Sequence, residues 1–166
     1  MKLSKQAKFL TRSAMIAALY VALTSVAASL GLSSGVIQIR ISEALCVLSV
    51  YTFAAVPGTF VGCLISNLIY GTLYDVIIGS LATLIGVLIA YWLRKLPYVS
   101  SVPTIISNTL LIPIVLILSG LGGWNMFAYF ALTVGIGEVI SCGVLGTLLV
   151  AYIEKHRSVK AVLFGD

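Results

Sequence analysis

Charge is what this chain of 166 residues has least of. Only 9% of its residues are Asp, Glu, Lys or Arg, and 60% are hydrophobic. Soluble globular domains carry about 25% charged residues, so this composition excludes an ordinary soluble fold. We predict an integral membrane protein, built as one transmembrane domain over residues 1–166, with the lipid bilayer as its surroundings.

Sequence motifs for nucleotide binding and for zinc catalysis are also missing. The sequence contains no G-x-x-x-x-G-K-[ST] loop and no H-E-x-x-H, and His156 is its only histidine. We therefore expect no ATPase activity, no metal site and no histidine-based catalytic triad in this chain. The three cysteines are isolated in apolar segments, which predicts small buried hydrophobic residues rather than a disulfide framework.

Long apolar segments fill most of the chain. At about 20 residues per crossing, five or six transmembrane helices fit. We predict an all-α bundle of six transmembrane helices, with a tight turn at Pro57 and Gly58 between the short second and third spans. The predicted spans are 13–30, 43–56, 59–70, 76–93, 103–118 and 124–153.

The positive charges set the orientation. Nine of the ten Lys and Arg residues lie in segment 1–12, in the turn at 94–95 and in the tail 154–166. Six spans place all three on the cytoplasmic side, as Lys and Arg prefer, with both termini inside. A five-span chain, with 43–70 as one kinked helix, would send the tail outward. The +5 net charge is thereby explained without nucleic acid.

A few charged residues interrupt the apolar spans. They are Arg40, Glu43, Asp75 and Glu138. Each costs about 2.5–3.5 kcal/mol at the bilayer centre on insertion scales, so each needs a reason to be there. We predict that most of them line one cavity that opens to the exterior.

Further polar and aromatic side chains lean toward the predicted outer loops, 31–42, 71–75 and 119–123. Within 31–42, Ile37, Ile39 and Ile41 alternate with polar residues, which predicts an extended segment at the interface or over a cavity. The candidate substrate-binding residues are Arg40, Glu43, Asn67, Tyr70, Tyr74, Asp75, Asn108, Trp124 and Glu138.

Structural roles are open for most of these residues. Glu138 is the hardest to explain structurally, because it lies midway along an apolar helix with no cation near it in the sequence. Arg40 and Glu43 could instead form an ion pair, with Ser42 as a helix cap, and Asp75 could cap the next helix. The aromatic candidates could be interfacial residues: Tyr70, Tyr74 and Trp124. Asn108 could make an interhelical hydrogen bond.

Small residues recur at every fourth position of the first helix. Ala14, Ala18 and Ala22 therefore share one face, which lets another helix approach closely. The stripe either packs inside the bundle or docks a partner subunit.

The chain resembles the QueT family, from about Arg12 to Ile153. Five motifs carry the resemblance: QIRISEAL at 38–45, PG at 57–58, GSLATL at 79–84, PTIISN at 103–108 and GE at 137–138. The resemblance implies a substrate-binding (S) component of an energy-coupling factor (ECF) transporter in the cell membrane of a prokaryote. It implies six helices with both termini inside, and the alanine stripe as the site that meets the coupling membrane subunit.

The resemblance also implies a cargo and partners. The cargo would be a queuosine precursor such as 7-aminomethyl-7-deazaguanine, captured outside and delivered inward. Two ATPase subunits would use the ATP, so this chain needs no cofactor. Three further functions stay open: an S component for another vitamin or base, a membrane enzyme that uses Glu43, Asp75 and Glu138 as acid–base groups, and an assembly subunit without ligand.

The chemistry of such a base can be compared with the candidate residues. Its guanine-like edge offers two parallel N–H donors, for which Glu138 is the first choice of acceptor and Glu43 the second. Its ring oxygen needs a donor, from Asn108 or Arg40. Tyr70, Tyr74 or Trp124 would stack on the ring, and Asp75 or the remaining glutamate would meet the cationic arm.

Overall fold

The chain folds as a bundle of helices. The computed structural model describes residues 4–32, 38–156, 158, 160 and 161, and within these ranges every regular element is helical. Four stretches are long and apolar enough to cross a membrane, and two further apolar helices are shorter. The predicted all-helical membrane class is therefore confirmed. The four long stretches are Lys5–Ser29, Asp75–Trp92, Pro97–Leu118 and Trp124–Lys155.

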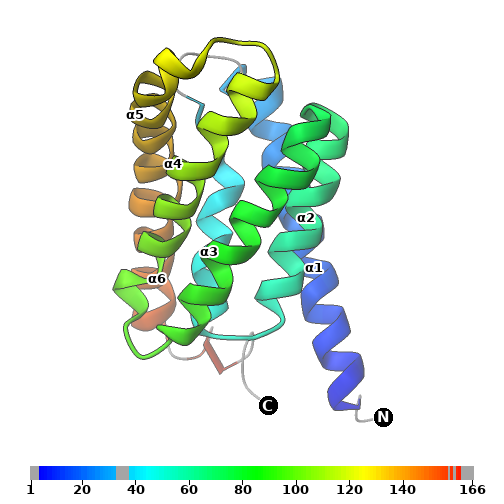
Figure 1. Ribbon diagram of the computed structural model, residues 1–166. Helices are drawn as coiled ribbons and strands as arrows, with labels where there is room; N and C mark the ends of the chain where they lie inside the picture. Colours follow the sequence, from blue (N-terminus) through cyan, green and yellow to red (C-terminus); the bar gives the residue numbers. More distant parts are fainter. Residues whose placement is uncertain (1–3, 33–37, 157, 159, 162–166) are drawn as a thin grey trace.

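The elements follow one another with short connections (Figure 1). η2 continues directly into α3, and α5, η5 and α6 form one long helix; η2 and η5 are π-helical, whereas η1, η3 and η4 are 3-10 helices. The start of α1 and the end of α6 lie at the same end of the bundle. In chain order the elements are α1 (Lys5–Ser29), η1 (Ile41–Val50), α2 (Ala55–Tyr70), η2 (Asp75–Gly79), α3 (Ser80–Trp92), η3 (Pro97–Val99), α4 (Ser101–Leu118), η4 (Trp124–Met126), α5 (Phe127–Glu138), η5 (Val139–Leu145) and α6 (Gly146–Lys155).

The short helix η1 lies in the middle of the bundle. All residues from Ser42 to Val50 are buried, and η1 contacts α1, α3, α6 and η5 (Figure 1). η1 is mostly apolar, so it is stable inside the bundle, where its polar residues find partners within the protein. Ten residues of 3-10 helix extend about 20 Å, less than the roughly 30 Å of a bilayer core. η1 therefore brings its polar residues into the protein interior rather than into contact with lipid.

Close packing of α1 against α2 orients the first helix. A Cβ added to Gly58 would lie 2.9 Å from Ile16 Cβ, and one added to Gly62 would lie 2.6 Å from Tyr20 Cβ. These two glycines therefore let the backbones approach more closely than any larger residue would. The alanine stripe faces the other way: Ala14, Ala18 and Ala22 are all exposed. Internal packing of the stripe, one of the two interpretations above, is therefore wrong for this chain.

The tight turn predicted at Pro57 and Gly58 is also wrong. The chain reverses earlier, where Ala55 N donates to Thr52 O at 3.1 Å, and α2 already begins at Ala55. Pro57 is the third residue of that helix. Proline is tolerated there because the first N–H groups of a helix have no acceptor within it.

Candidate functional site

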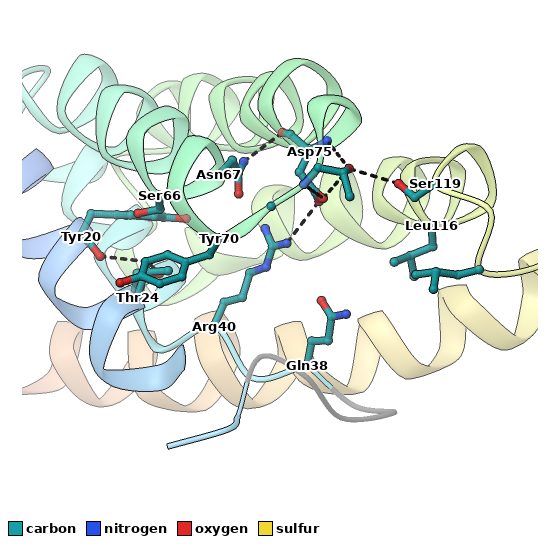
Figure 2. A pocket seen from close by; sticks show the side chains of 14 residues that line it. Tyr20, Thr24, Gln38, Arg40, Ser66, Asn67, Tyr70, Asp75, Leu116 and Ser119 are labelled. Carbon is teal, nitrogen blue, oxygen red and sulfur yellow. Dashed lines mark hydrogen bonds and ion pairs between the residues drawn. The ribbon is translucent and has the colours of Figure 1, made fainter. Parts of the chain in front are cut away.

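A cavity of about 260 Å³ lies near the C-terminal ends of α2 and α4 (Figure 2). These helix ends are at the end of the bundle opposite the start of α1 (Figure 1). The walls of the cavity come from α1, from the segment around Arg40, from the end of α2 with the turn that follows, and from the end of α4. Four of the nine candidate residues line it. The lining residues are Tyr20, Thr24, Gln38, Arg40, Ser42, Ser66, Asn67, Tyr70, Gly71, Thr72, Asp75, Leu116, Ser119 and Leu121.

Asp75 is held firmly at the cavity wall. Its Oδ2 accepts hydrogen bonds from Thr72 N at 2.9 Å and Thr72 Oγ1 at 2.8 Å, and its own N–H donates to Thr72 Oγ1 at 3.3 Å. This reciprocal arrangement is a capping box, so Asp75 does help to cap the helix that begins here. Its Oδ1 remains available and lies 3.5 Å from Arg40 Nη2 (Figure 2).

Arg40 is shared among acidic groups. Its ion pair is with Asp75, not with Glu43 as one interpretation of the sequence held. Its charge also interacts with those of Glu43 and Glu138. Of these three acids, Asp75 is the one that makes a direct contact with the guanidinium.

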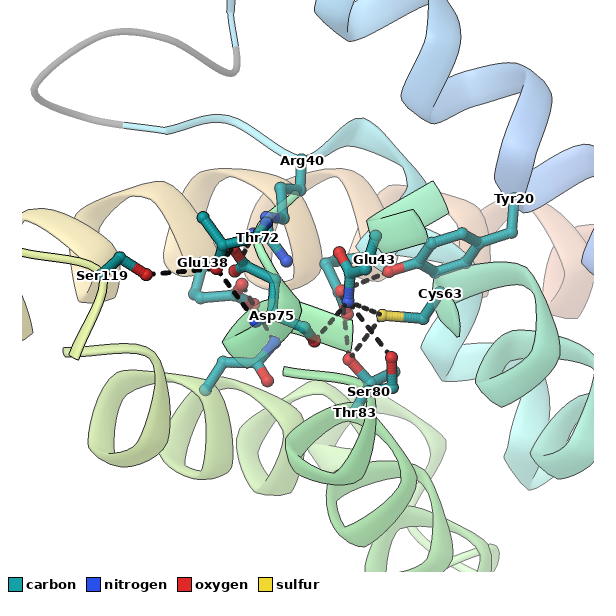
Figure 3. Close-up of polar contacts among 12 residues, drawn as sticks. Tyr20, Arg40, Glu43, Cys63, Thr72, Asp75, Ser80, Thr83, Ser119 and Glu138 are labelled. Atoms are coloured by element: carbon teal, nitrogen blue, oxygen red, sulfur yellow. Dashed lines mark hydrogen bonds and ion pairs between the residues drawn. The ribbon is translucent and has the colours of Figure 1, made fainter. Parts of the chain in front are cut away.

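Glu43 is fully buried and well supplied with donors (Figure 3). Its Oε1 accepts hydrogen bonds from the Tyr20 hydroxyl and, at 3.3 Å, from Thr83 Oγ1; its Oε2 accepts one from Cys46 Sγ at 3.1 Å. These donors belong to α1, α3 and η1. Glu43 thus ties three helices together, and its hydrogen-bonding capacity is largely used within the chain.

The Asn108–Glu138 pair has the opposite character. Asn108 Nδ2 donates to Glu138 Oε1 at 3.0 Å, yet Glu138 Oε2 and Asn108 Oδ1 find no donor within the part of the chain that the structure describes. Both residues are buried: Glu138 has 5% of its surface exposed and Asn108 has 1%. A buried acceptor without a donor costs about 1–3 kcal/mol. Donors from a ligand, or a proton on Glu138, would relieve that cost.

The segment that carries Arg40 lies directly on α5 beside Glu138. A Cβ added to Gly137 would lie only 2.1 Å from the Gln38 carbonyl oxygen. Only glycine allows this approach. Gly137 therefore fixes the height of the segment above Glu138, and with it the wall of the cavity.

The remaining candidates lie elsewhere. Tyr74 and Trp124 do not line the cavity and are 41% and 66% exposed, as interfacial aromatics would be. Glu43, Asn108 and Glu138 are buried beyond its wall. A role of these five residues in binding stays a prediction.

Sequence reasoning missed several wall residues. Ser66 is the most informative, because it is 2% exposed and its hydroxyl has no partner among the described residues. Its position one turn before Tyr70 on α2 was readable, since residues four apart share a helix face. Thr72 was readable as part of the Thr72-x-x-Asp75 capping box. No comparable local signal marked the other missed wall residues, which include Tyr20, Thr24, Gln38 and Ser119. Within the described ranges no three His, Cys, Asp or Glu residues are grouped to hold a metal ion.

Apolar helices, a small polar cavity at one end and one buried carboxylate, Glu138, with an oxygen that has no donor among the described residues are the arrangement of a membrane protein able to hold a small polar solute. Known proteins make this more specific. The QueT transporter family model matches residues 10–155, and the chain belongs to that family. The resemblance predicted from the five sequence motifs is confirmed.

One characterised relative shares part of the sequence. Over 85 residues the chain is 40% identical to the "Queuosine precursor transporter QueT" of Lactococcus lactis subsp. cremoris (strain MG1363). The match covers 51% of this chain and 50% of the relative, so it spans about half the length of either protein. No solved structure matches this chain.

Proposed function

We propose that this chain is the substrate-binding component of an ECF importer in the cell membrane of a prokaryote, with a queuosine precursor such as 7-aminomethyl-7-deazaguanine as its cargo. The observation that carries the proposal is the pair of buried acceptors without donors among the described residues, Glu138 Oε2 and Asn108 Oδ1. Neither residue lines the cavity, so binding would have to open the wall between the cavity and this pair. A guanine-like edge supplies two parallel N–H donors to such acceptors. Family membership and the name of the L. lactis relative support the same cargo.

The cavity suits a small base with a cationic arm. Its volume of about 260 Å³ lies below the 300–1,000 Å³ typical of pockets for drug-sized ligands, which favours a bicyclic base over a nucleotide. Tyr20 and Tyr70 offer aromatic surface at the wall, and Asp75 offers a carboxylate oxygen to an ammonium group. Asn108 gives one N–H to Glu138, and its Oδ1 has no donor among the described residues, so it also offers an acceptor to a ligand.

The membrane topology proposed for this function has six helical segments with both termini inside. The described cations other than Arg40 belong to the start of α1, the turn after α3 and the region of the end of α6, which lie at the same end of the bundle (Figure 1). Arg40 instead lines the cavity, together with residues of the turns that follow α2 and α4. This distribution supports the proposal through the preference of Lys and Arg for the cytoplasmic side. The cavity would then open to the exterior, where the cargo is captured.

Docking to a coupling membrane subunit is proposed for the exposed alanine stripe of α1. Two ATPase subunits bound to that partner would drive release inward. We expect Ala18→Leu to abolish most substrate uptake in cells that express the whole transporter, because it blocks close helix approach, while the purified chain still binds ligand. Met15→Leu, at an exposed position beside the stripe, is the control and should leave uptake intact. Equal uptake by both variants would contradict the docking role.

A ligand screen tests the function. Thermal unfolding of the detergent-purified chain should shift upward with 7-aminomethyl-7-deazaguanine and not with common vitamins, because a ligand that binds only the folded state stabilises it. Glu138→Gln should lose the shift. A shift with a vitamin alone would indicate a different S component, chemical turnover by the purified chain would indicate an enzyme, and no shift with any compound would indicate an assembly subunit.

A further inference from the structure

The contact between Arg40 and Asp75 is unusually weak for two charged groups that share a cavity. It is a single contact of 3.5 Å, whereas charge-assisted hydrogen bonds are about 2.7–2.9 Å long and arginine often makes two in parallel. Both side chains are mostly buried, with 20% and 12% of their surface exposed. The guanidinium is therefore close enough to neutralise Asp75 but is not locked to it.

Asp75, in contrast, is fixed in place. The Asp75 Oδ2 accepts two hydrogen bonds from Thr72. The Asp75 backbone carbonyl accepts a third, from Asn67 Nδ2 at 2.9 Å. Arg40 extends from the non-helical segment that precedes η1, and its side chain reaches across the cavity toward Asp75 (Figure 2). Of the two partners, the arginine is the one that can be displaced while the carboxylate stays where it is.

We propose that Arg40 is a built-in substitute for the cationic group of the ligand. In the empty cavity its guanidinium neutralises Asp75, and on binding the ligand's ammonium group takes its place at Asp75 Oδ1. This inference rests on the proposed function for the presence of a cationic ligand. An ammonium group carries three donors and can approach the carboxylate at full hydrogen-bonding distance, so the exchange replaces a weak ion pair by a stronger one.

The exchange also fits another group on the cavity wall. Ser66 adds a hydroxyl on the same wall that has no partner among the described residues and that a bound ligand would satisfy.

Two ligands that differ only in their arm test the proposal by isothermal titration calorimetry. One is 7-aminomethyl-7-deazaguanine, which is cationic, and the other is 7-cyano-7-deazaguanine, which is neutral. Arg40→Gln removes the competitor, so we expect about tenfold tighter binding of the cationic base and no gain for the neutral one. Asp75→Asn should weaken the cationic base at least tenfold and the neutral base little. Arg40→Lys keeps a competing charge and should behave like the unmodified protein.

Several outcomes would overturn the proposal. If Arg40→Gln weakens both bases equally, Arg40 binds the ligand directly and does not compete with it. If neither base binds the unmodified chain, the proposed function itself fails, whereas binding of both bases without any effect of Arg40→Gln overturns only the exchange. Should Arg40→Gln not fold, NMR of the arginine guanidinium groups in the unmodified chain decides: the Arg40 signal must shift with the cationic base and not with the neutral one.

Discussion

Glu43 and Glu138 are the same residue type, both almost without solvent exposure, and the protein treats them in opposite ways. Glu43 accepts hydrogen bonds from Tyr20, Cys46 and Thr83, which belong to three helices. Glu138 accepts one, from Asn108, and its second oxygen has none from the described residues. The difference shows that burial of a carboxylate in a membrane protein does not by itself mark a binding site. A better guide is whether each carboxylate oxygen receives a hydrogen bond from the protein.

The surroundings explain this difference. Glu43 begins a helix that is enclosed on all sides, so neighbouring helices supply donors from several directions. Glu138 lies between Gly137, which has no side chain to donate, and a π-helical segment that starts at Val139. Gly137 also admits the backbone of the segment around Gln38 next to this turn of the helix. We infer that Glu43 stabilises the bundle and that Glu138 is kept for a ligand.

The largest expected effect is a loss of folding stability when Glu43, rather than Glu138, is replaced by alanine. Glu43→Ala strands the buried hydroxyl of Tyr20, leaves Thr83 with only a weak contact to Cys63 Sγ and opens a cavity in the core, so we expect the free energy of unfolding to fall by roughly 3 kcal/mol. Glu138→Ala strands one donor, Asn108 Nδ2, but also removes the buried Oε2 that has no donor among the described residues, so it should cost less, about 1 kcal/mol. Thermal and denaturant unfolding in detergent measure both. Equal losses for the two variants would show that Glu43 has no special structural role.

The next prediction concerns the wall above Glu138. In Gly137→Ala the new methyl group would lie 2.1 Å from the Gln38 carbonyl oxygen, so the segment that carries Arg40 must move. Overpacking of this kind costs about 1–3 kcal/mol, which corresponds to roughly tenfold to a hundredfold weaker ligand binding if the cost falls on the site. Calorimetric titration measures the loss.

Gly143→Ala is the matched control for this change. Its Cβ would meet Ile105 Cδ1 at 3.5 Å, an ordinary van der Waals contact, so the variant should bind ligand as the unmodified chain does. If the two alanine variants bind equally well, the segment around Gln38 does not form the wall of the binding site.

The smallest predicted effect separates two serines whose hydroxyls both lack hydrogen-bond partners in the described part of the chain. Ser66 and Ser141 are both buried, but of the two only Ser66 lines the cavity. Ser66→Ala should weaken ligand binding about fivefold, since a typical hydrogen bond contributes about 1 kcal/mol. Ser141→Ala should leave the dissociation constant unchanged. The idea fails if Ser141→Ala weakens binding as much as Ser66→Ala.

Much of the fold was readable from composition and patterning. Apolar run lengths predicted the helical membrane class, the repeat of Ala14, Ala18 and Ala22 predicted a smooth helix face, and the isolation of Glu138 in sequence marked it as unusual. The capping box at Thr72 and Asp75 is likewise a local signal. Features that depend on residues a few positions apart were therefore within reach of the sequence.

Tertiary contacts were not within reach. Two of the donors to Glu43 lie 23 and 40 residues away in the chain, so its saturation could not be distinguished from the deficit at Glu138. The enclosure of η1 was missed for the same reason: a short apolar segment looks alike whether neighbouring helices or lipid surround it. The tight turn predicted at Pro57 was wrong because proline is common both in tight turns and in the first turn of a helix.

The central claim, that Glu138 and Asn108 are kept unsatisfied for the two N–H donors of a guanine-like base, is tested most directly by removing one donor from the ligand. Isothermal titration calorimetry would compare 7-aminomethyl-7-deazaguanine with its analogue that lacks the 2-amino group, on the unmodified chain and on Glu138→Gln. We predict that the unmodified chain prefers the complete base by about tenfold or more and that Glu138→Gln loses most of this preference. Equal affinity of the unmodified chain for the two bases, or a preference that survives in Glu138→Gln, would contradict the account.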